Sequence, residues 1–297
     1  MPCPNTSVVT KGVGHQALTP DSLMLQLSGI AIDATSVGGL ETCIQLPGLK
    51  LALDIGRCPR SAVLQDTVLI THGHMDHIGG VCYHAATRGL MGLTPPTYVI
   101  GPENEAAFKA LFNAYRRLDR SRLAHELIVV GPGERIPLRN NHFAVPFRSI
   151  HRVPCQGYSV WSSKKKLKAE YQGLSGHEIR DLRVAGKEIT DTLEYPVLSF
   201  TGDSLIEVLE KEEVVRKSKV LVMEVTFVDD RVSVEQCRSK GHIHLDEVVE
   251  RAELFENESI LFTHFSARYS AKQIIAALDE KLPPGLRERV TPLVHSH

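Results

Sequence analysis

Three histidines and one aspartate stand close together in the run HGHMDH at residues 72–77. Imidazole and carboxylate groups are ligands of Zn²⁺ and of related transition metals, and packing alone rarely requires three histidines in one short segment. The spacing of these side chains is too tight for one face of a helix. The run therefore predicts a loop that turns its side chains toward two adjacent metal ions.

Other candidate ligands follow apolar runs that we predict to be strands. Three such runs lead into His151, Asp203 and His264. A rim of N and O ligands at strand ends places a metal site on rigid elements. Together with the first run, these residues exceed one tetrahedral site, so we expect two metal ions with Asp203 as their bridge. The candidate ligands are His72, His74, Asp76, His77, His151, Asp203 and His264.

The ligand types favour Zn²⁺, with Mn²⁺ or iron as alternatives, because imidazole and carboxylate are present and thiolate is not. A zinc ion that only stabilises the fold is the other interpretation, but structural sites are usually closed tetrahedra that contain cysteine. Isolated histidines elsewhere in the chain show no such pattern, and we interpret them as surface or packing residues. They are His15, His84, His125, His142, His177, His295 and His297.

Short apolar runs bounded by turn residues alternate with a few amphipathic helices. Continuous apolar character predicts strands that are covered on both faces. These runs are residues 49–55, 67–70, 143–150, 197–200, 220–225 and 260–263. Apolar residues at i, i+3, i+4 and i+7 predict helices over residues 108–115 and 245–255. A third helix should begin at Ser270, where Ser270 and Gln273 fit a capping box, and should stop before Pro283.

Composition indicates an ordinary soluble globular protein. The 297 residues are 42% hydrophobic and 23% charged with a net charge of −1, so any nucleic-acid contact requires a local basic patch. No apolar run approaches the roughly 20 residues that span a bilayer, and residues 1–25 lack the pattern of a secretory signal. The six cysteines form no C-x-x-C pair, which indicates reduced thiols. We therefore expect a cytoplasmic protein without a membrane segment; a nuclear or plastid pool stays open.

Residues 162–191 differ from the rest of the chain, because they are rich in Lys, Glu and Gly and show little strand pattern. We interpret them as an insertion that protrudes from the folded core, and a long surface loop is the alternative. Residues 1–22 are expected to be a flexible tail, and residues 23–297 to form one domain that contains the insertion.

The run H-x-H-x-D-H followed by I-G-G resembles the metallo-β-lactamase superfamily, and the resemblance extends over nearly the whole chain. Several segments outside this motif resemble the short, plant-type form of RNase Z, the tRNA 3′-processing endonuclease. They are residues 39–43 (GLETC), 54–59 (DIGRCP), 86–90 (ATRGL), 171–176 (YQGLSG) and 264–269 (HFSARY). The resemblance implies an α/β fold, the αββα metallo-β-lactamase sandwich, with a protruding exosite arm at about residues 160–192.

The resemblance also assigns roles to the candidate ligands. His72, His74 and His151 would hold one zinc ion, Asp76, His77 and His264 would hold the second, and Asp203 would bridge the two. Asp54 would steer a ligand histidine through its ring N–H. A plain turn or strand-end aspartate is the alternative for Asp54.

In this family a Glu and a His act together near the leaving group, in H-E-A-T and G-H-S-T motifs. The matching segments are MEVT at residues 223–226 and GHIH at residues 241–244, so Glu224 and His242 are retained while their neighbours differ. The resemblance implies that a zinc-activated water attacks the phosphodiester with Asp76 as general base, and that His242, held by Glu224, protonates the departing 3′ oxygen. His244 can instead be a neighbour of a helix N-cap without a catalytic part.

The implied activity is that of a zinc-dependent endoribonuclease that removes the 3′ trailer from precursor tRNA, leaving a tRNA 3′-OH and a trailer 5′-phosphate. The insertion would bind tRNA phosphates through a lysine cluster, although a charge run is usually a solvated face. That cluster is Lys164, Lys165, Lys166 and Lys168. The family acts as a homodimer. Alternatives are another hydrolase of this fold, such as a small phosphodiesterase, thioesterase or lactonase, and an inactive RNA-binding scaffold, which the full ligand set argues against.

Overall fold

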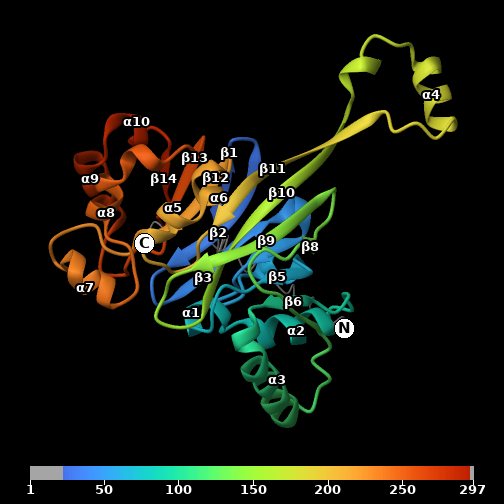
Figure 1. Cartoon of the computed structure of the whole chain (residues 1–297). Helices are drawn as coiled ribbons and strands as arrows, with labels where there is room; N and C mark the ends of the chain where they lie inside the picture. Colours follow the sequence, from blue (N-terminus) through green and yellow to red (C-terminus); the bar gives the residue numbers. More distant parts are fainter. Residues whose placement is uncertain (1–22, 295–297) are drawn as a thin grey trace, which may run out of the picture.

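The computed structural model describes residues 23–294, so the expected tail at residues 1–22 and the histidines His15, His295 and His297 lie outside the described residues. Within this range two seven-stranded sheets form the centre of the fold (Figure 1). The first sheet follows chain order and contains β1 (Leu23–Leu27), β2 (Ile30–Val37), β3 (Glu41–Leu46), β4 (Leu51–Leu53), β5 (Thr67–Leu69), β6 (Thr97–Ile100) and β7 (Glu126–Val129). The second has the order β14-β13-β12-β11-β10-β9-β8 and contains β8 (Ile136–Pro137), β9 (His142–Ser149), β10 (Cys155–Leu167), β11 (Thr190–Phe200), β12 (Val220–Glu224), β13 (Ser259–Thr263) and β14 (Val290–Pro292).

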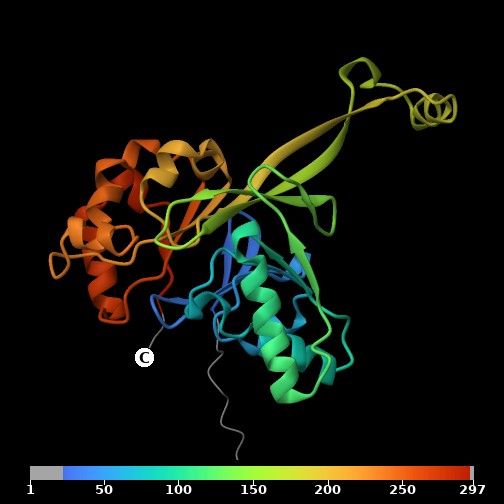
Figure 2. The same ribbon diagram turned by 60° about the horizontal axis from the view of Figure 1, so that its bottom comes forward.

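The sheets pack face to face, and helices cover their outer faces (Figures 1 and 2). Between the sheets, Leu53 and Leu69 of the first share one apolar cluster with Tyr158, Val222 and Leu261 of the second. A separate cluster joins the first sheet to helices α2 and α3, and another joins the second sheet to helices α5 to α10. The four-layer αββα arrangement expected from the resemblance is therefore confirmed.

Four of the helices within the described residues have nine or more residues, and the others have four to six. Their bounds are α1 (Met75–Ile78), α2 (Val81–Leu90), α3 (Glu105–Asp119), α4 (Gly176–Val184), α5 (Glu207–Lys211), α6 (Glu213–Lys217), α7 (Val234–Ser239), α8 (Leu245–Glu250), α9 (Ala271–Lys281) and α10 (Pro284–Arg287). Short 3₁₀ turns are η1 (Pro47–Leu49), η2 (Arg60–Leu64), η3 (Pro102–Asn104), η4 (Ala169–Tyr171) and η5 (Ala252–Leu254).

The strands that precede the candidate ligands point toward one rim of the sandwich. In the first sheet, β4 and β5 are parallel, and the chain continues from them to Asp54 and to His72. In the second sheet, β11, β12 and β13 are parallel and lead to Asp203, Glu224 and His264. β9 is antiparallel to β10, which is antiparallel to β11, so β9 runs in the same direction as β11. Parallel strands end at the same edge, so buried and rigid elements deliver these side chains to one place.

An arm projects from the second sheet. β10 and β11 continue beyond the sheet as a two-stranded ribbon that carries η4 and α4 at its far end (Figures 1 and 2). A register shift opposite Val160 and Trp161 skips Val197 of β11, which makes a β-bulge near the base of this ribbon. The sequence of residues 162–191, with its weak strand pattern, did not indicate the strands that form this stem. The ribbon has no core to face, so its sequence lacks the apolar alternation by which we recognise strands.

Differences from the predicted strands and helices concern mostly their ends. β4 spans only Leu51–Leu53, because Lys50 and Asp54 on either side adopt positive φ values of 54° and 59°. The helix predicted over residues 245–255 ends at Glu250, and a 3₁₀ turn follows. The helix predicted to begin at Ser270 is confirmed as α9, with Ser270 and Gln273 forming the capping box.

Candidate metal centre

The first group of candidate ligands consists of His72, His74 and His151 with one oxygen of Asp203. His72 Nε2 lies 3.0 Å and His151 Nε2 lies 3.3 Å from His74 Nδ1. His72 Nε2 lies 3.7 Å from Asp203 Oδ2. One ligand atom from each residue lies within 4.8 Å of those of the others. His72 and Asp203 are buried while His74 and His151 are partly exposed, so the group opens toward solvent on one side.

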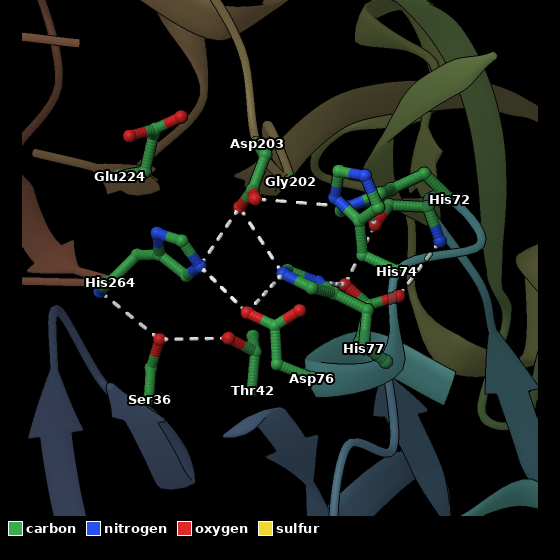
Figure 3. Close-up of polar contacts among 12 residues, drawn as sticks. Ser36, Thr42, His72, His74, Asp76, His77, Gly202, Asp203, Glu224 and His264 are labelled. Carbon is green, nitrogen blue, oxygen red and sulfur yellow. Dashed lines mark hydrogen bonds and ion pairs between the residues drawn. The ribbon is translucent and has the colours of Figure 1, made fainter. Parts of the chain in front are cut away.

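The second group consists of Asp76, His77 and His264 with the other oxygen of Asp203. Asp76 Oδ2 lies 3.3 Å from His264 Nε2 and 3.7 Å from His77 Nε2. Asp203 Oδ1 lies 3.3 Å from His77 Nε2 and 3.4 Å from His264 Nε2. Figure 3 shows Asp203 reaching in between His264 and the histidines of residues 72–77, with Asp76 facing it. Because its two oxygens face different groups, Asp203 is placed to bridge two ions.

The spacing of these atoms fits metal coordination. Ligand atoms about 2.1 Å from a tetrahedral zinc ion lie roughly 3.4 Å from one another. The distances within both groups, from 3.0 to 3.7 Å, scatter around this value. His77 Nε2 is buried and has no hydrogen-bond partner within residues 23–294, although it points at two carboxylates. A buried nitrogen without a hydrogen-bond partner is energetically unfavourable unless it binds something else. The free lone pair of His77 Nε2 therefore fits coordination of a metal ion.

The charges around the site agree with this fit. Burial lowers the pKa of His72 to about 2, and neighbouring His77 adds to the effect, so the His72 ring is neutral and offers a lone pair. Burial also opposes charge on His77, but Asp203 and Asp54 outweigh it and raise the pKa of His77. Burial would raise the pKa of Asp203, yet His264 and His77 hold it well below its ordinary value. The carboxylates thus favour positive charge at the point where a cation would bind.

Hydrogen bonds to the Nδ1 atoms, on the side away from the metal centre, fix the orientation of several histidines. Asp54 is fully buried and its Oδ2 lies 2.7 Å from His77 Nδ1. The same oxygen accepts a hydrogen bond from the Thr71 hydroxyl at 2.8 Å, and that hydroxyl lies 3.0 Å from His72 Nδ1. His151 Nδ1 lies 2.8 Å from the Gly241 carbonyl oxygen. In each case Nδ1 is occupied, which leaves Nε2 to face the centre.

Glu224 connects a ligand histidine with a histidine beside the centre. Its side chain is only 1% exposed, and its Oε1 lies 3.0 Å from His242 Nδ1. Its Oε2 accepts a hydrogen bond of 2.5 Å from the Thr226 hydroxyl, which in turn lies 3.0 Å from His264 Nδ1. The backbone N–H groups of Ser204 and Ile243 also donate to Glu224. One buried carboxylate therefore positions both His242 and His264.

Close backbone packing holds the loop of residues 72–77 against the end of β4. The Ile55 N–H donates to the His77 carbonyl oxygen at 2.8 Å. A Cβ on Gly56 would lie 2.1 Å from the Asp76 carbonyl oxygen, so only glycine allows this approach. His264 adopts a positive φ of 60°, and its N–H donates to the Ser36 hydroxyl at 3.1 Å. The ligands thus depend on backbone positions from both sheets.

The structure brings together all the residues that the sequence suggested for the centre. The ligand groups, Asp54, Glu224 and His242 lie within one connected set of contacts. The lysine cluster of residues 164–168 does not approach the centre and lies on the arm (Figure 1). His244 caps α8, where its side chain accepts from the Asp246 N–H. The roles of Thr71 and Thr226, whose hydroxyls orient His72 and His264, were not predicted from the sequence. For Thr226, the family-like segment MEVT at residues 223–226 was the one feature that could have indicated a role.

Comparisons with known proteins place this geometry in a superfamily. The chain matches the Beta-lactamase superfamily domain over residues 56–265. Its fold is similar to the metallo-beta-lactamase fold protein YhfI from Bacillus subtilis, with a TM-score of 0.58, 13% identity, and coverage of 88% of this chain and 95% of that one. It is also similar to human tRNase Z, short form, with a TM-score of 0.51, 16% identity and coverage of 90% of both chains. This chain belongs to the β-lactamase superfamily.

Sequence identity shows to which family within this superfamily the chain belongs. The chain is 47% identical to tRNase Z TRZ1 of Arabidopsis thaliana over 271 residues, which are 91% of this chain and 96% of that relative. It belongs to the tRNase Z family, which confirms the resemblance seen in the sequence.

Replacement of the bridging residue should remove metal from the protein. We expect Asp203→Ala to lose bound metal, because both groups lose a ligand and the attraction of the shared negative charge. Metal analysis of purified protein by plasma mass spectrometry measures this. Asp279→Ala, which removes an exposed carboxylate that pairs with Arg287, is the matched control and should keep the wild-type content. An Asp203→Ala protein with undiminished metal would contradict the bridging role.

Proposed function

We propose that this chain is a zinc-dependent endoribonuclease that removes the 3′ trailer from precursor tRNA, leaving a 3′-OH on the tRNA and a 5′-phosphate on the trailer. The observation that carries the proposal is the placement of Asp203 between two ligand groups, with the buried Glu224 and the partly exposed His242 paired beside them. Similarity to a protein named tRNase Z over 91% of this chain supports the substrate. The imidazole and carboxylate donors, without thiolate, support two zinc ions per chain.

Two divalent cations, when bound, supply Lewis acidity that activates a water molecule and neutralises phosphoryl oxygens. The ligand side chains fix the position of this chemistry. Asp76 Oδ2 accepts a hydrogen bond of 2.9 Å from the Gly39 N–H, which holds the carboxylate in place. Burial would raise the pKa of Asp76, but the contacts with His264 and His77 lower it below its ordinary value. An ionised and fixed Asp76 can orient the attacking water and accept its proton as general base.

His242 is the proposed general acid. Burial alone would lower the pKa of His242, but the charge and hydrogen bond of Glu224, with Asp203, raise it to about 9. A raised pKa favours the protonated imidazole that a general acid requires. Its side chain is 17% exposed, so it can still reach a substrate. His242 would donate this proton to the departing 3′ oxygen, while Glu224 keeps the ring in orientation.

We propose that the arm binds tRNA away from the cleavage site. Its lysines Lys164, Lys165 and Lys166 are exposed on β10, and Lys168 is half-buried where η4 begins. Neighbouring strand residues point to opposite faces, so Lys164 and Lys166 share one face and Lys165 lies on the other. Such charges can bind phosphates by counterion release without reading sequence.

An apolar surface on α2 and α3 supports the proposal of a homodimer. Tyr83, Leu90, Tyr115 and Leu118 are exposed on these two helices, and Leu118 is 79% exposed. Tyr83, Tyr115 and Leu118 line one hollow of about 490 Å³. Large exposed apolar areas of this kind usually mark a contact with another molecule. A second copy of the chain is the occupant that we propose.

The described cysteines, Cys43, Cys58, Cys82, Cys155 and Cys237, are all unpaired. Free thiols support a reducing compartment, and we propose the cytoplasm. Residues 23–294 contain no helix that is long and apolar enough to cross a membrane.

Incubation of the protein with a 3′-extended tRNA, with and without a chelator, tests the proposed activity. We expect one cut at the junction of tRNA and trailer that disappears with chelator and returns when Zn²⁺ is added, because the reaction depends on the cations. Mapping both product ends should give 3′-OH and 5′-phosphate. Hydrolysis of a small model diester with no cleavage of precursor tRNA would instead favour another hydrolase of this fold.

Removal of the proposed general acid should slow cleavage without emptying the metal centre. We expect His242→Ala to retain wild-type metal content and to lose about 10²–10⁴-fold in rate, the usual contribution of a general acid. Single-turnover kinetics on precursor tRNA measure the loss. His142→Ala, a change of a half-buried histidine whose Nδ1 lies 2.8 Å from the Asn140 carbonyl oxygen, should leave the rate unchanged. An unchanged rate in His242→Ala would exclude the role.

Introducing a charge on the apolar surface should separate the proposed dimer. We expect light scattering to give twice the chain mass of 32.9 kDa for the wild type and a single chain for Leu118→Glu, because a carboxylate cannot be buried there without a partner. Val184→Glu, at an 81% exposed position on α4, is the matched control and should remain dimeric. A monomeric wild type would refute the proposal.

A further inference from the structure

The segment that carries His242 is held by a short helix with little apolar anchorage. The Gly241 N–H donates to the Arg238 carbonyl oxygen at 2.9 Å, in the last turn of α7. The His242 N–H donates to the Cys237 carbonyl oxygen at 3.3 Å, and the Cys237 thiol donates to the His242 carbonyl oxygen at 3.2 Å. α7 has only six residues, of which Cys237 alone is buried. Helices of this length are marginal by themselves, so α7 needs other contacts to hold this segment in place.

Arg238 connects α7 to two neighbouring helices. Its Nη1 lies 2.6 Å from Glu247 Oε1 of α8 and 3.4 Å from Glu207 Oε2 of α5. Its Nη2 donates to the other oxygen of Glu207. The planar fork of arginine allows one side chain to make these bonds together, and the single ammonium of lysine does not. The Arg238 guanidinium therefore joins α5, α7 and α8 at one point.

Burial makes these ion pairs different from ordinary surface pairs. Exposed pairs contribute little, because water screens them and two long side chains lose freedom. The Glu247 side chain, however, is only 4% exposed, and its Oε2 accepts a hydrogen bond of 3.2 Å from the His244 N–H. A carboxylate so far removed from water needs its partner. Glu247 therefore holds Arg238 with one oxygen and the backbone two residues after His242 with the other.

Arg238 also links the segment of His242 to the segment of Asp203. Glu207 follows Asp203 by four residues, and His242 follows Arg238 by four. The Arg238–Glu207 pair thus joins the segment of the proposed general acid to that of the proposed bridging ligand. His242 Nδ1 lies 3.9 Å from Asp203 Oδ2, so a shift of either segment changes this separation. Glu224 of β12 holds the His242 ring from the sheet, and Arg238 holds the same segment from the helices.

We propose that Arg238 is a positioning residue, which clamps the segment of His242 between α5 and α8 and so keeps the general acid within reach of the departing 3′ oxygen. The inference rests on the proposed function, because it takes His242 as the acid for this oxygen. Arg238 itself takes no part in the proton transfer. A general acid must lie within hydrogen-bond reach of the atom that it protonates, and a displacement of about 1 Å can cost about 10²-fold in rate.

The test compares the wild type with Arg238→Lys and with Arg238→Met combined with Glu247→Gln. Lysine keeps the charge but cannot pair with both carboxylates in the geometry of the fork. The double replacement removes the buried charge together with its partner, so it leaves no unpaired carboxylate and keeps the inference testable if Arg238→Lys is unstable. Metal content and melting temperature check that each protein is intact.

Arg251→Lys is the matched control. The Arg251 side chain is 24% exposed and pairs with Glu210 of α5, so it resembles Arg238 in burial and in the helix that it contacts. In the described part of the chain, however, it forms no hydrogen bond or ion pair with residues 240–244. Its replacement should therefore leave His242 in place.

Two substrates separate an effect on the acid from a general loss of structure. One is a 3′-extended precursor tRNA, and the other carries sulfur in place of the 3′ oxygen at the scissile bond. In the second, water forms the new bond to phosphorus and sulfur departs with the electron pair of the broken P–S bond. Because a thiol has a pKa of about 8.5, far below that of an alcohol, the thiolate leaves without receiving a proton. Cleavage of the sulfur substrate therefore does not require the general acid.

We expect both Arg238 variants to lower kcat for the precursor about tenfold to a hundredfold with KM unchanged, because a contact of the transition state is lost and not one of the bound substrate. Both should cut the sulfur substrate as fast as the wild type. Arg238→Lys added to His242→Ala should slow the precursor no further than His242→Ala alone, since residues that act as a unit are not additive. Arg251→Lys should match the wild type on both substrates.

Three results would overturn the inference. An unchanged kcat in both Arg238 variants would show that the clamp does not position the acid. An equal loss on the oxygen and sulfur substrates would show a general structural role. A further loss when Arg238→Lys is added to His242→Ala would show that the arginine acts independently of the acid. Failure of the proposed function gives a different pattern, in which His242→Ala cuts the precursor as fast as the wild type or the wild type does not cut it, and the inference then fails with it.

Discussion

The whole centre depends on one buried carboxylate, Asp203, which lies between two groups of histidines. Its oxygens face His72 on one side and His77 and His264 on the other, at 3.3 to 3.7 Å. Removing charge from water costs several kcal/mol per ion unless opposite charge compensates it. A side chain only 3% exposed that stays ionised must therefore be balanced from within the site. Two cations, as proposed, would meet this requirement, and they would explain why the buried His77 Nε2 has no hydrogen-bond partner within residues 23–294.

The fold places the candidate ligands around Asp203 by bringing strand ends from two sheets to one rim. The first sheet supplies the loop of residues 72–77, and the second supplies Asp203 and His264. Hydrogen bonds connect these candidate ligands to buried carboxylates behind them. Thr226 joins His264 to Glu224, and Thr71 joins His72 to Asp54. Because Glu224 also holds His242, the orientation of the proposed acid and that of a metal ligand are not independent. A change at Glu224 should therefore affect both.

Much of the fold and of the candidate centre could be predicted from the sequence. The ligands could be found because each follows a buried strand, whose apolar run is visible in the sequence, and because the run at residues 72–77 is unusual. Thr71 and Thr226 could not, because a hydroxyl gains its role from a partner elsewhere in the chain, such as His264 beside Thr226. The ribbon of the arm was missed because exposed strands carry no apolar period. A pocket beside His151 was also invisible, since Thr71, Asn104 and Arg148 in its walls come from separate segments that meet only in the folded chain.

Anomalous diffraction at the zinc edge, from crystals of the protein grown with Zn²⁺, would locate the metal ions relative to Asp203. We expect two peaks. One should lie between Asp203 Oδ2 and the nitrogens of His72, His74 and His151, and the other between Asp203 Oδ1, Asp76, His77 and His264. Their separation should be about 3.5–4 Å, as in other two-metal hydrolytic sites. A single peak, or peaks that do not share Asp203, would contradict this expectation.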